Sequence, residues 1–405
     1  MNKVPNLRFK EFSGDWGSKK IGEITIKVGS GKTPKGGNSV YTDEGIIFLR
    51  SQNVLNGKLS LDDVAYITED INSTMKSTEV YPNDILLNIT GASIGRSCCV
   101  PESFERANVN QHVCIIRLNK NYNSNFVMNQ IISSRVQKQI NSFQAGGNRE
   151  GLNFEQIKGM KISSTTLEEQ EKIASFFSLI DKKIELQTEK VEELKNYKKG
   201  IMQKIFSQEL RFKDENGNEY PEWEISTIEK IANLEKGFTP DTKDEEGWIG
   251  DIPWLSIADM KQGKYVANVS KYISNKALGK KHLVPTGTLI MSFKLTIGRL
   301  AIVEEPLMTN EAICHFYWKN SNINTEYMYY YLNSVNVESF GCRAAKGITL
   351  NNDSLNSIVV KIPVIQEQKK ISELLMSVDK KIEKEQEKLE RLKQYKQGLL
   401  RQMFI

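Results

Sequence analysis

Two long segments of the chain repeat apolar residues in alternating steps of four and three, which predicts coiled-coil helices. They occupy residues 169–206 and 367–404, contain no proline, and are identical at 18 of 38 aligned positions. A helix of this length extends roughly 57 Å at about 1.5 Å per residue. Its apolar stripe therefore needs a second helix to pack against, and we expect each segment to pair with its own copy.

The seam of this predicted pair contains two polar positions in each helix. Gln187 and Lys198 in the first helix are matched by Glu385 and Lys396 in the second. The simplest interpretation is that these residues fix the register of the coil. The alternative is that they face helices of another subunit.

The duplication extends beyond the helices. Short identities recur about half a chain apart, namely Thr33-Pro34 with Thr239-Pro240, Ile94-Gly95-Arg96 with Ile297-Gly298-Arg299, and Asn110 with Asn310. The segment Leu7–Lys10 repeats Leu210–Lys213, which follows the first helix. The order of the segments is therefore cyclic. This order predicts antiparallel helices and two chain termini that lie close together.

Between the helices, short strand patterns alternate with turns and a few helical patterns. We expect strands at residues 46–49, 84–87, 113–116, 289–291 and 314–317, and helices at 124–134 and 325–333. The predicted fold class is α+β, with two similar mixed α/β domains joined by two long antiparallel coiled-coil helices in pseudo-two-fold, cyclic symmetry. The predicted segments are a first domain (1–165), a central helix (166–207), a second domain (208–364) and a distal helix (365–405).

Composition narrows the classes of function. The chain has 405 residues and a net charge of +5, which permits nucleic-acid binding without requiring it. The five cysteines form no C-x-x-C pair and the three histidines are isolated, so we expect neither a metal site nor a disulfide framework. Neither an apolar run of about 18 residues nor a signal-like N-terminus occurs, which predicts a cytoplasmic protein without membrane contact.

The stretch Gly29-Ser-Gly-Lys-Thr-Pro34 resembles the end of a phosphate-binding loop, which would imply nucleotide binding. The first glycine of that motif would fall at Ile26, and the duplicate loop, Lys236-Gly-Phe-Thr-Pro240, lacks the Gly-Lys pair. We therefore interpret the shared Gly-x-Thr-Pro as a structural turn, with Lys32 and Lys35 near an anionic partner.

A second candidate chemistry is the arrangement of Asp241, Asp259 and Lys261, which resembles the metal-binding set of a nuclease. The equivalent positions of the first domain carry lysine, asparagine and leucine. The sequence has no Pro-Pro pair, as an adenine methyltransferase motif would need, and no Ser/His/Asp set. We therefore predict no catalytic residue and no bound metal.

Several motifs together resemble those of the specificity (S) subunits of type I restriction–modification systems. They are the duplicated helix starts at 167–184 and 366–382, the stretches 86–96 and 110–113, and Gly151-Leu-Asn153. The resemblance implies two target-recognition domains that each read half of a split DNA site. It also implies that the helices space these domains and dock two methyltransferase subunits. One departure is the linker at 162–167, which lacks the prolines typical of the family.

The resemblance also implies what the chain itself does not do. An S subunit is not catalytic, whereas its partners methylate adenine N6 with S-adenosylmethionine or cleave DNA with ATP and Mg²⁺. We therefore expect no cofactor in this chain. The expected partners are double-stranded DNA, methyltransferase (M) subunits and restriction (R) subunits.

Basic and amide side chains on the predicted loops are the candidate DNA contacts, because such groups bond phosphates and base edges. They are Lys32, Lys35, Arg50, Arg96, Arg149, Lys294, Arg299, Arg343 and Lys346, with Asn53, Gln111 and Asn351 as base readers. Because Arg96 and Arg299 recur at matched positions, we expect them to share a phosphate contact. The candidate partner-binding residues on the helices are Ile184, Val191, Leu194, Tyr197, Ile382, Leu389, Leu392 and Tyr395.

Two other hypotheses stay open at this point. The first is a coiled-coil scaffold without intrinsic DNA specificity, which would show no preference for any duplex. The second is a nucleotide-dependent enzyme, in which Lys32→Ala would abolish ATP binding.

Overall fold

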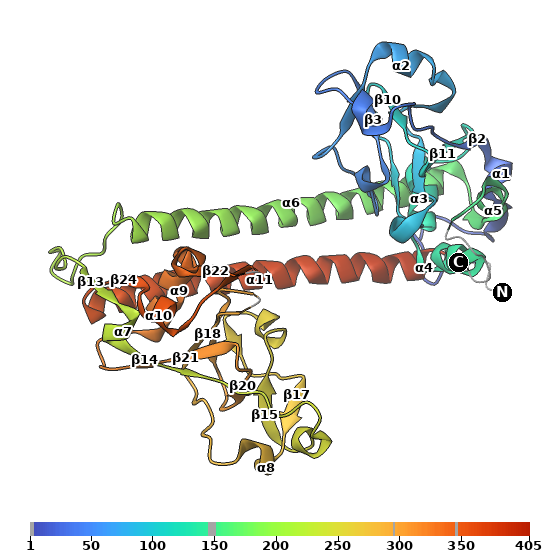
Figure 1. The fold of residues 1–405 in the computed structure, drawn as a ribbon. Helices are drawn as coiled ribbons and strands as arrows, with labels where there is room; N and C mark the ends of the chain where they lie inside the picture. Colours follow the sequence, from blue (N-terminus) through green and yellow to red (C-terminus); the bar gives the residue numbers. More distant parts are fainter. Residues whose placement is uncertain (1–3, 145–150, 295, 345–346) are drawn as a thin grey trace. The chain divides into compact units, whose positions relative to one another are not determined.

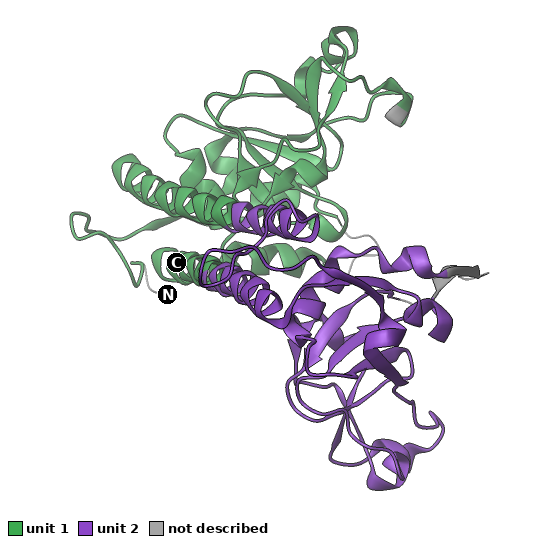
Figure 2. Cartoon of the chain, turned by 90° about the vertical axis from the view of Figure 1, so that its left-hand side faces the viewer, with its two compact units in different colours: residues 1–190, 385–405 green, residues 191–384 purple. Residues whose placement is uncertain are grey.

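The chain forms two compact units in the computed structural model, which describes residues 4–144, 151–294, 296–344 and 347–405. Unit 1 comprises residues 1–190 and 385–405, and unit 2 comprises residues 191–384 (Figure 2). Each unit contains one mixed α/β domain and part of each long helix, α6 (Leu167–Phe206) and α11 (Ile365–Met403) (Figure 1). Both predicted long helices are therefore present.

Unit 1 contains a central sheet of order β2-β11-β8-β9, a distal sheet of order β6-β3-β10-β7, and the pairs β1-β12 and β4-β5. Its strands are β1 (Gly17–Lys20), β2 (Thr25–Ser30), β3 (Ile46–Leu49), β4 (Val54–Leu55), β5 (Lys58–Leu59), β6 (Ala65–Ile67), β7 (Glu79–Val80), β8 (Ile85–Asn88), β9 (Ser97–Cys99), β10 (Ala107–Val109), β11 (Val113–Leu118) and β12 (Lys161–Ser164). Its domain helices are α1 (Ile21–Ile24), α2 (Glu69–Ser73), α3 (Ser124–Ile131), α4 (Ser134–Gln144) and α5 (Phe154–Gly159), with short 3₁₀ turns η1 (Gly37–Val40), η2 (Ser51–Asn53), η3 (Lys76–Thr78) and η4 (Gly91–Ser93).

Unit 2 repeats this plan with a central sheet of order β14-β21-β18-β19-β16, a distal sheet of order β17-β15-β20, and the pairs β13-β24 and β22-β23. Its strands are β13 (Glu224–Thr227), β14 (Ala232–Lys236), β15 (Ile252–Leu255), β16 (Tyr265–Val266), β17 (Lys271–Ile273), β18 (Leu289–Ser292), β19 (Leu300–Val303), β20 (Met308–Thr309), β21 (Ile313–Trp318), β22 (Cys342–Ala344), β23 (Gly347–Thr349) and β24 (Val359–Ile362). Its helices are α7 (Ile228–Ile231), α8 (Asn275–Leu278), α9 (Thr325–Ser334) and α10 (Asn352–Asn356), with 3₁₀ turns η5 (Glu245–Trp248), η6 (Asp259–Gln262) and η7 (Val337–Phe340).

The five predicted strands are all present, as is the helix predicted at 325–333. The helix predicted at 124–134 is wrong at its end, because α3 stops at Ile131 and α4 begins at Ser134. The break follows from Ser133, whose hydroxyl donates to the Gln130 carbonyl (2.6 Å) at the end of α3. Such local side-chain bonds compete with helix continuation.

The core of each unit packs on both faces of its central sheet. In unit 1, Ile85 and Leu87 of β8 belong to the cluster that includes α3 and the long helices, whereas Leu86 belongs to the cluster shared with the distal sheet. Burial on both faces explains why this strand is apolar without alternation. In unit 2, Met291 and Ile290 of β18 divide between two clusters in the same way.

The long helices run antiparallel within each unit, as predicted. In unit 1, Asp181 and Gln187 of α6 contact Lys396 and Glu385 of α11, so the numbering rises along one helix and falls along the other. In unit 2, Ile205 near the end of α6 shares a core cluster with residues near the start of α11. Every position of the predicted apolar seam is buried or half-buried.

Each polar seam residue bonds to a side chain of the facing helix. Gln187 Nε2 donates to Glu385 Oε2 (2.7 Å), and bonds from Lys190 and Gln187 lower the pKa of Glu385 to about 2. Lys396 Nζ binds Asp181 Oδ1 (2.5 Å) in unit 1, and Lys198 Nζ binds Asp379 Oδ1 (2.6 Å) at the matched position of unit 2. Since sliding the helices by one turn would break these bonds, they support the interpretation of register control.

The predicted cyclic order is confirmed in unit 1, where the N-terminal segment continues from the end of α11. The Leu7 N–H donates to the Gln402 carbonyl (3.0 Å), just as the Leu210 N–H donates to the Lys204 carbonyl (3.0 Å) in unit 2. Lys204 and Gln402 are equivalent in the helix repeat. The two termini therefore lie close together, and Phe404 packs against Trp16 with ring centroids 6.4 Å apart.

A buried glutamate at the start of each long helix ties the helix to the segment that precedes the domain. Glu169 accepts from Arg8 Nε (2.7 Å) and Trp16 Nε1 (3.1 Å). In unit 2, Glu367 accepts from Arg211 Nη2 (2.9 Å) and Trp223 Nε1 (3.0 Å). The sequence showed only that these glutamates recur, and their bracing role came from the structure.

Candidate nucleic-acid interface

One buried asparagine gathers loops of unit 1 that carry predicted DNA contacts. Asn88, at the end of β8, donates through its N–H to the Arg96 carbonyl (2.9 Å) and through Nδ2 to the Ser51 carbonyl (2.8 Å). The loops that carry Arg50 and Arg96 therefore meet at Asn88, which sequence reasoning missed. A polar residue that interrupts the apolar run of β8 was the available signal.

The glycine-rich loop after β2 is a structural turn, as predicted. Gly31 passes so close to the distal sheet that a Cβ atom would lie 1.7 Å from the Val109 carbonyl oxygen. The Lys32 N–H donates to that same oxygen (3.2 Å), and in unit 2 the Phe238 N–H donates to the Thr309 carbonyl (2.9 Å). Lys32 and Lys35 are exposed beyond this turn, so their charges remain available to an anionic partner.

The prediction that Asn53 reads a base is wrong. Its side chain is 2% exposed, and it accepts from the Arg50 N–H (2.8 Å) and donates to the Asp63 carbonyl (2.8 Å). Asn53 thus closes the η2 turn. The guanidinium of Arg50 forms an ion pair with the exposed Asp63 carboxylate (3.2 Å), a contact of low intrinsic strength that a phosphate can replace.

The phosphate contact predicted to be shared by Arg96 and Arg299 stays a prediction, but the two side chains differ in their surroundings. Arg96 is exposed, and its guanidinium has no hydrogen-bond or ion-pair partner among the described residues. Arg299 Nη1 donates to the Ile257 carbonyl (3.2 Å). In unit 1 the equivalent carbonyl, that of Ser51, is bonded by Asn88. Arg299 therefore does in unit 2 the bracing that Asn88 does in unit 1.

The remaining candidates divide into three groups. Gln111 and Lys294 are exposed. Asn351 is the N-cap of α10, where its side-chain oxygen accepts from the Ser354 N–H (2.8 Å). Arg149 and Lys346, together with the side chain of Arg343, lie outside the described residues.

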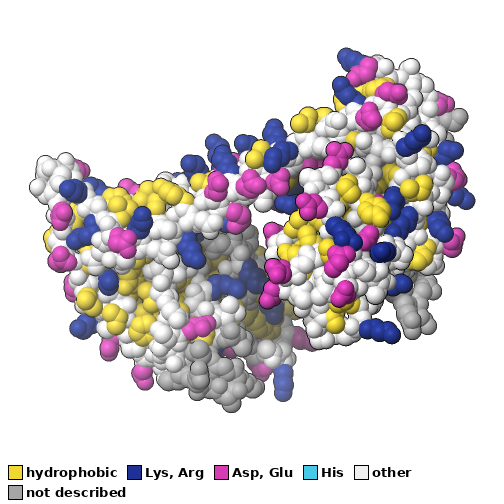
Figure 3. All heavy atoms as spheres, turned by 90° about the horizontal axis from the view of Figure 1, so that it is seen from above, with side chains coloured by type: hydrophobic (Ala, Val, Ile, Leu, Met, Phe, Trp, Pro, Cys, Tyr) yellow, Lys and Arg dark blue, Asp and Glu magenta, His cyan; other side chains and the backbone are white. Residues whose placement is uncertain are grey.

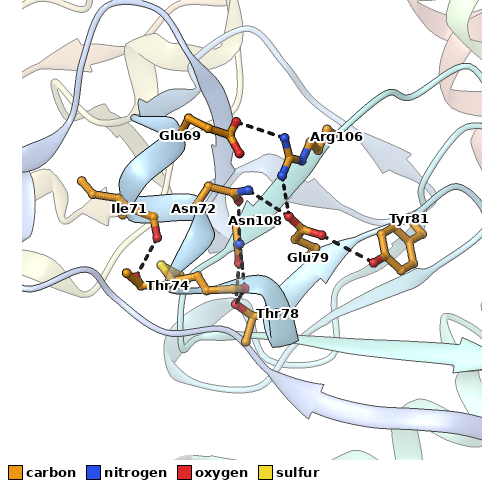
Figure 4. A network of polar contacts seen from close by, with 10 residues as sticks. Glu69, Ile71, Asn72, Thr74, Thr78, Glu79, Tyr81, Arg106 and Asn108 are labelled. Carbon is orange, nitrogen blue, oxygen red and sulfur yellow. Dashed lines mark hydrogen bonds and ion pairs between the residues drawn. The ribbon is translucent and has the colours of Figure 1, made fainter.

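The two distal sheets are lined by different chemistry. In unit 1, buried Asn108 donates to Asn72 Oδ1 (3.0 Å), Asn72 donates to Glu79 (2.9 Å), and Arg106 bridges Glu79 and Glu69 (Figure 4). This closed network holds α2 against the sheet and engages Arg106, a basic residue that would otherwise be a candidate DNA contact.

In unit 2 the position equivalent to Asn108 is Met308, which packs with Trp254 and Ile273 in an apolar cluster. The matched strands thus differ at this position, which is polar in unit 1 and apolar in unit 2.

Asp259, one member of the nuclease-like set, has a structural role in a turn. Asp259 Oδ2 accepts from the N–H (2.9 Å) and hydroxyl (2.7 Å) of Ser256, which makes it the unit 2 counterpart of the Asn53 turn. Among the described residues no three His, Cys, Asp or Glu side chains are placed to hold a metal ion. Burial raises the pKa of the Cys98, Cys114 and Cys314 thiols to about 12, so these thiols are not nucleophiles at neutral pH.

Comparison with known proteins agrees with this geometry. The family model described as the type I restriction modification DNA specificity domain matches residues 13–196 and 220–394. The chain belongs to this DNA specificity family. It is therefore a non-catalytic DNA-recognition subunit of the type I restriction–modification class.

The relatives share this architecture at low sequence identity. The putative type I restriction enzyme MjaX specificity subunit of Methanocaldococcus jannaschii is 25% identical over 96% of this chain and 93% of its own length. The MjaIX specificity subunit of the same organism is 29% identical, over 49% of this chain and 48% of its own length. The crystal structure of an S subunit from M. genitalium superposes with a TM-score of 0.58, at 15% identity over 99% of both chains.

Most of the helix residues predicted to bind partners of this specificity subunit are instead used within its own coil. Val191, Ile382 and Leu389 are buried at 2%, 8% and 7% exposure, and Ile184, Leu194 and Leu392 are half-buried. That part of the prediction is wrong, because a heptad seam is satisfied by the helix that shares it. Tyr197 and Tyr395, which are equivalent in the repeat, are exposed.

The surface of the specificity subunit carries both signs of charge. On the face shown in Figure 3, lysine and arginine side chains are interspersed with aspartate and glutamate. Specific recognition would therefore depend on a few placed side chains more than on a general basic field. In the described part of the chain, no helix is both long enough and apolar enough to span a bilayer.

Proposed function

We propose that each domain of this specificity subunit reads one half of a bipartite DNA site, while the paired helices dock two methyltransferase subunits. The proposal rests on one observation: the two domains are held to the helices by the same contacts, but they differ at matched loop positions. Glu169 and Glu367 brace the two domains in the same way, yet Arg96 and Arg299 differ in role at matched positions. The matched helices can bind identical partner subunits, and the loops that differ between the domains can read different bases.

The partner subunits supply the chemistry in this proposal. Methyltransferase subunits methylate adenine with S-adenosylmethionine, and restriction subunits cleave with ATP and Mg²⁺. The chain contributes recognition and placement, and it binds none of these cofactors itself. The runner-up hypothesis, a scaffold without DNA specificity, predicts methylation that follows no sequence motif.

The proposal is tested by co-expressing the chain with its cognate methyltransferase subunit and mapping methylated adenines across the genome. We expect a split motif with two unequal halves separated by unspecified bases. Methylation that is absent, or that follows no motif, would contradict the proposal and favour the scaffold.

Arg96→Ala is expected to weaken DNA binding by the assembled methyltransferase. Because Arg96 is exposed and unpaired among the described residues, its loss should remove about one phosphate contact and reduce the slope of log affinity against log salt by about 0.9. Titrations of the cognate duplex at several salt concentrations measure this slope. Arg299→Ala is the matched comparison, since its main effect should be lower stability. An unchanged slope in Arg96→Ala would exclude the phosphate contact.

Replacement of two exposed leucines on α6 is expected to weaken the docking of one methyltransferase subunit. Leu179 and Leu186 are 72% and 53% exposed in unit 1, and the equivalent residues of α11 are Ser377 and Lys384. Burying a leucine stabilises an interface by about 1.5–3 kcal/mol. Leu179→Ser with Leu186→Lys should therefore weaken this docking at least tenfold, as measured by native mass spectrometry, whereas Ser377→Ala should not. Full retention of both subunits would contradict the prediction.

A further inference from the structure

A cavity of about 550 Å³ lies within unit 1, between the recognition domain and the long helix. The β4-β5 hairpin, helix α3 and helix α6 form its walls, with Gly57, Met128, Asn129, Asp181 and Ile184 among the lining residues. The predicted DNA contacts are other residues, whereas Asp181 and Ile184 also contribute to the coil. The cavity therefore lies apart from the predicted DNA contacts.

A buried acceptor without a partner lines this cavity. Asn129 is 1% exposed, and its Nδ2 donates to the Asn125 carbonyl (2.9 Å). Its Oδ1 is buried and has no hydrogen-bond partner among the described residues. A buried acceptor without a donor is costly, so its presence in a cavity wall points to a ligand that brings a donor.

The duplicate shows which chemistry fills the corresponding place in unit 2. Asn123 and Asn324 are the N-caps of α3 and α9, and this match aligns Met128 with Tyr329 and Asn129 with Tyr330. The hydroxyl of Tyr330 donates to Asp379 Oδ2 (2.5 Å). Asp379 is the counterpart of Asp181, which lines the cavity in unit 1. Phenol rings of the chain itself thus occupy in unit 2 the place that is hollow in unit 1.

The two units also differ in the position of an equivalent lysine side chain. Lys264 of unit 2 is drawn inward, 11% exposed, with its Nζ 4.5 Å from the Tyr330 ring centroid. Its counterpart Lys58 points to the rim of the cavity, where its Nζ binds Glu185 Oε1 (3.1 Å) at 61% exposure. In unit 1 the described lining residues include no aromatic ring, and the ammonium group of Lys396 binds Asp181 Oδ1 in the cavity wall (2.5 Å).

We infer that the cavity of unit 1 binds one phenol ring, whose hydroxyl donates to Asn129 Oδ1 while the ring packs on Met128 and Ile184. The ring comes from a small free phenol or from a tyrosine side chain. Bound there, it would join α3 to α6, as Tyr330 joins α9 to α11 in unit 2.

The full-length chain is titrated with p-cresol, the side-chain analogue of tyrosine, and with toluene, which lacks the hydroxyl. Calorimetry and the unfolding midpoint are the readouts. We expect p-cresol to bind with a stoichiometry of one and to raise the midpoint. Toluene should bind roughly tenfold more weakly, because it leaves Asn129 Oδ1 unpaired. N-acetyltyrosinamide distinguishes the two sources of the ring. If it binds as tightly as p-cresol, the natural ligand is a tyrosine side chain. If it does not bind, the natural ligand is a small free phenol.

Two variants place the site. Asn129→Tyr, which copies unit 2, should fill the cavity and abolish p-cresol binding without lowering the midpoint. Asn129→Leu should keep the volume and erase the preference for p-cresol over toluene, so the test survives if the tyrosine variant does not fold. Equal binding of toluene and p-cresol by the natural chain, or unchanged p-cresol binding in the variant that folds, would overturn the inference.

Discussion

Gly31→Ala is expected to destabilise the first recognition domain by about 3 kcal/mol or more, because the added methyl group has no space. Its Cβ would lie 1.7 Å from the Val109 carbonyl oxygen, 2.3 Å from the carbonyl carbon and 2.7 Å from the Asn110 carbonyl oxygen. These are backbone atoms at the end of β10, an internal strand of the distal sheet, and they cannot move without disturbing strand pairing. The measurement is urea-induced unfolding of the full chain, with DNA binding as a second readout.

A matched control lies two residues earlier. Gly29 lies in β2, just before the turn that contains Gly31, and a Cβ there would meet no atom within 4 Å. Gly29→Ala should change stability by less than about 0.5 kcal/mol. Lys32→Ala should also leave stability unchanged while weakening DNA binding. If Gly31→Ala folds as stably as the natural chain, the tight crossing described here is wrong.

The same comparison separates a structural turn from a nucleotide loop. In a phosphate-binding loop the lysine is the indispensable residue, because it contacts the phosphates. Here the indispensable residue is the glycine, since an added Cβ at Gly237 would likewise clash with the Thr309 carbonyl oxygen, at 2.2 Å. Both copies keep that glycine although only one keeps the lysine. The repeated Gly-x-Thr-Pro sequence therefore has a structural role in both domains.

Features set by periodicity or repetition could be predicted from the sequence. The heptad steps located α6 and α11, and the repeat of Leu7–Lys10 at Leu210–Lys213 placed the N-terminal segment after the second helix. Both inferences depend on local pattern and on the equivalence of the two copies. Neither requires knowing how a side chain folds back on distant residues.

Side-chain roles that depend on distant contacts could not be predicted in this way. Asn53 is buried because residues 60–63 fold over it, and Arg299 is engaged by a carbonyl 42 positions away. The repeat held a partial clue, because Asn53 matches Asp259 and both residues close a turn with a side-chain oxygen. Burial of Val191 and Leu389 was likewise implied by the heptad itself, and assigning them to partner binding disregarded that implication.

Glu169→Ala is expected to destabilise unit 1 by about 3–5 kcal/mol, because it removes one partner of a buried charge pair. Glu169 is 1% exposed, and the Arg8 guanidinium binds both of its carboxylate oxygens at 2.7 and 2.8 Å. Alanine would leave that guanidinium and the Trp16 N–H without their acceptor. Calorimetry of the full chain measures the loss, and limited proteolysis should release the N-terminal segment.

The duplication turns this prediction into a test of how the domains are held. Glu168 is exposed and adjacent, so Glu168→Ala should stay within about 0.5 kcal/mol of the natural chain. Glu367→Ala should destabilise unit 2 in turn, since Arg211 and Trp223 bind Glu367 in the same arrangement. Reading of a bipartite site requires both domains. Glu169→Ala should therefore abolish methylation of the whole motif under conditions that unfold unit 1, and Glu367→Ala should do so under conditions that unfold unit 2. Retained methylation in both variants, with unchanged melting, would show that the glutamate brace does not hold the domains on the coil.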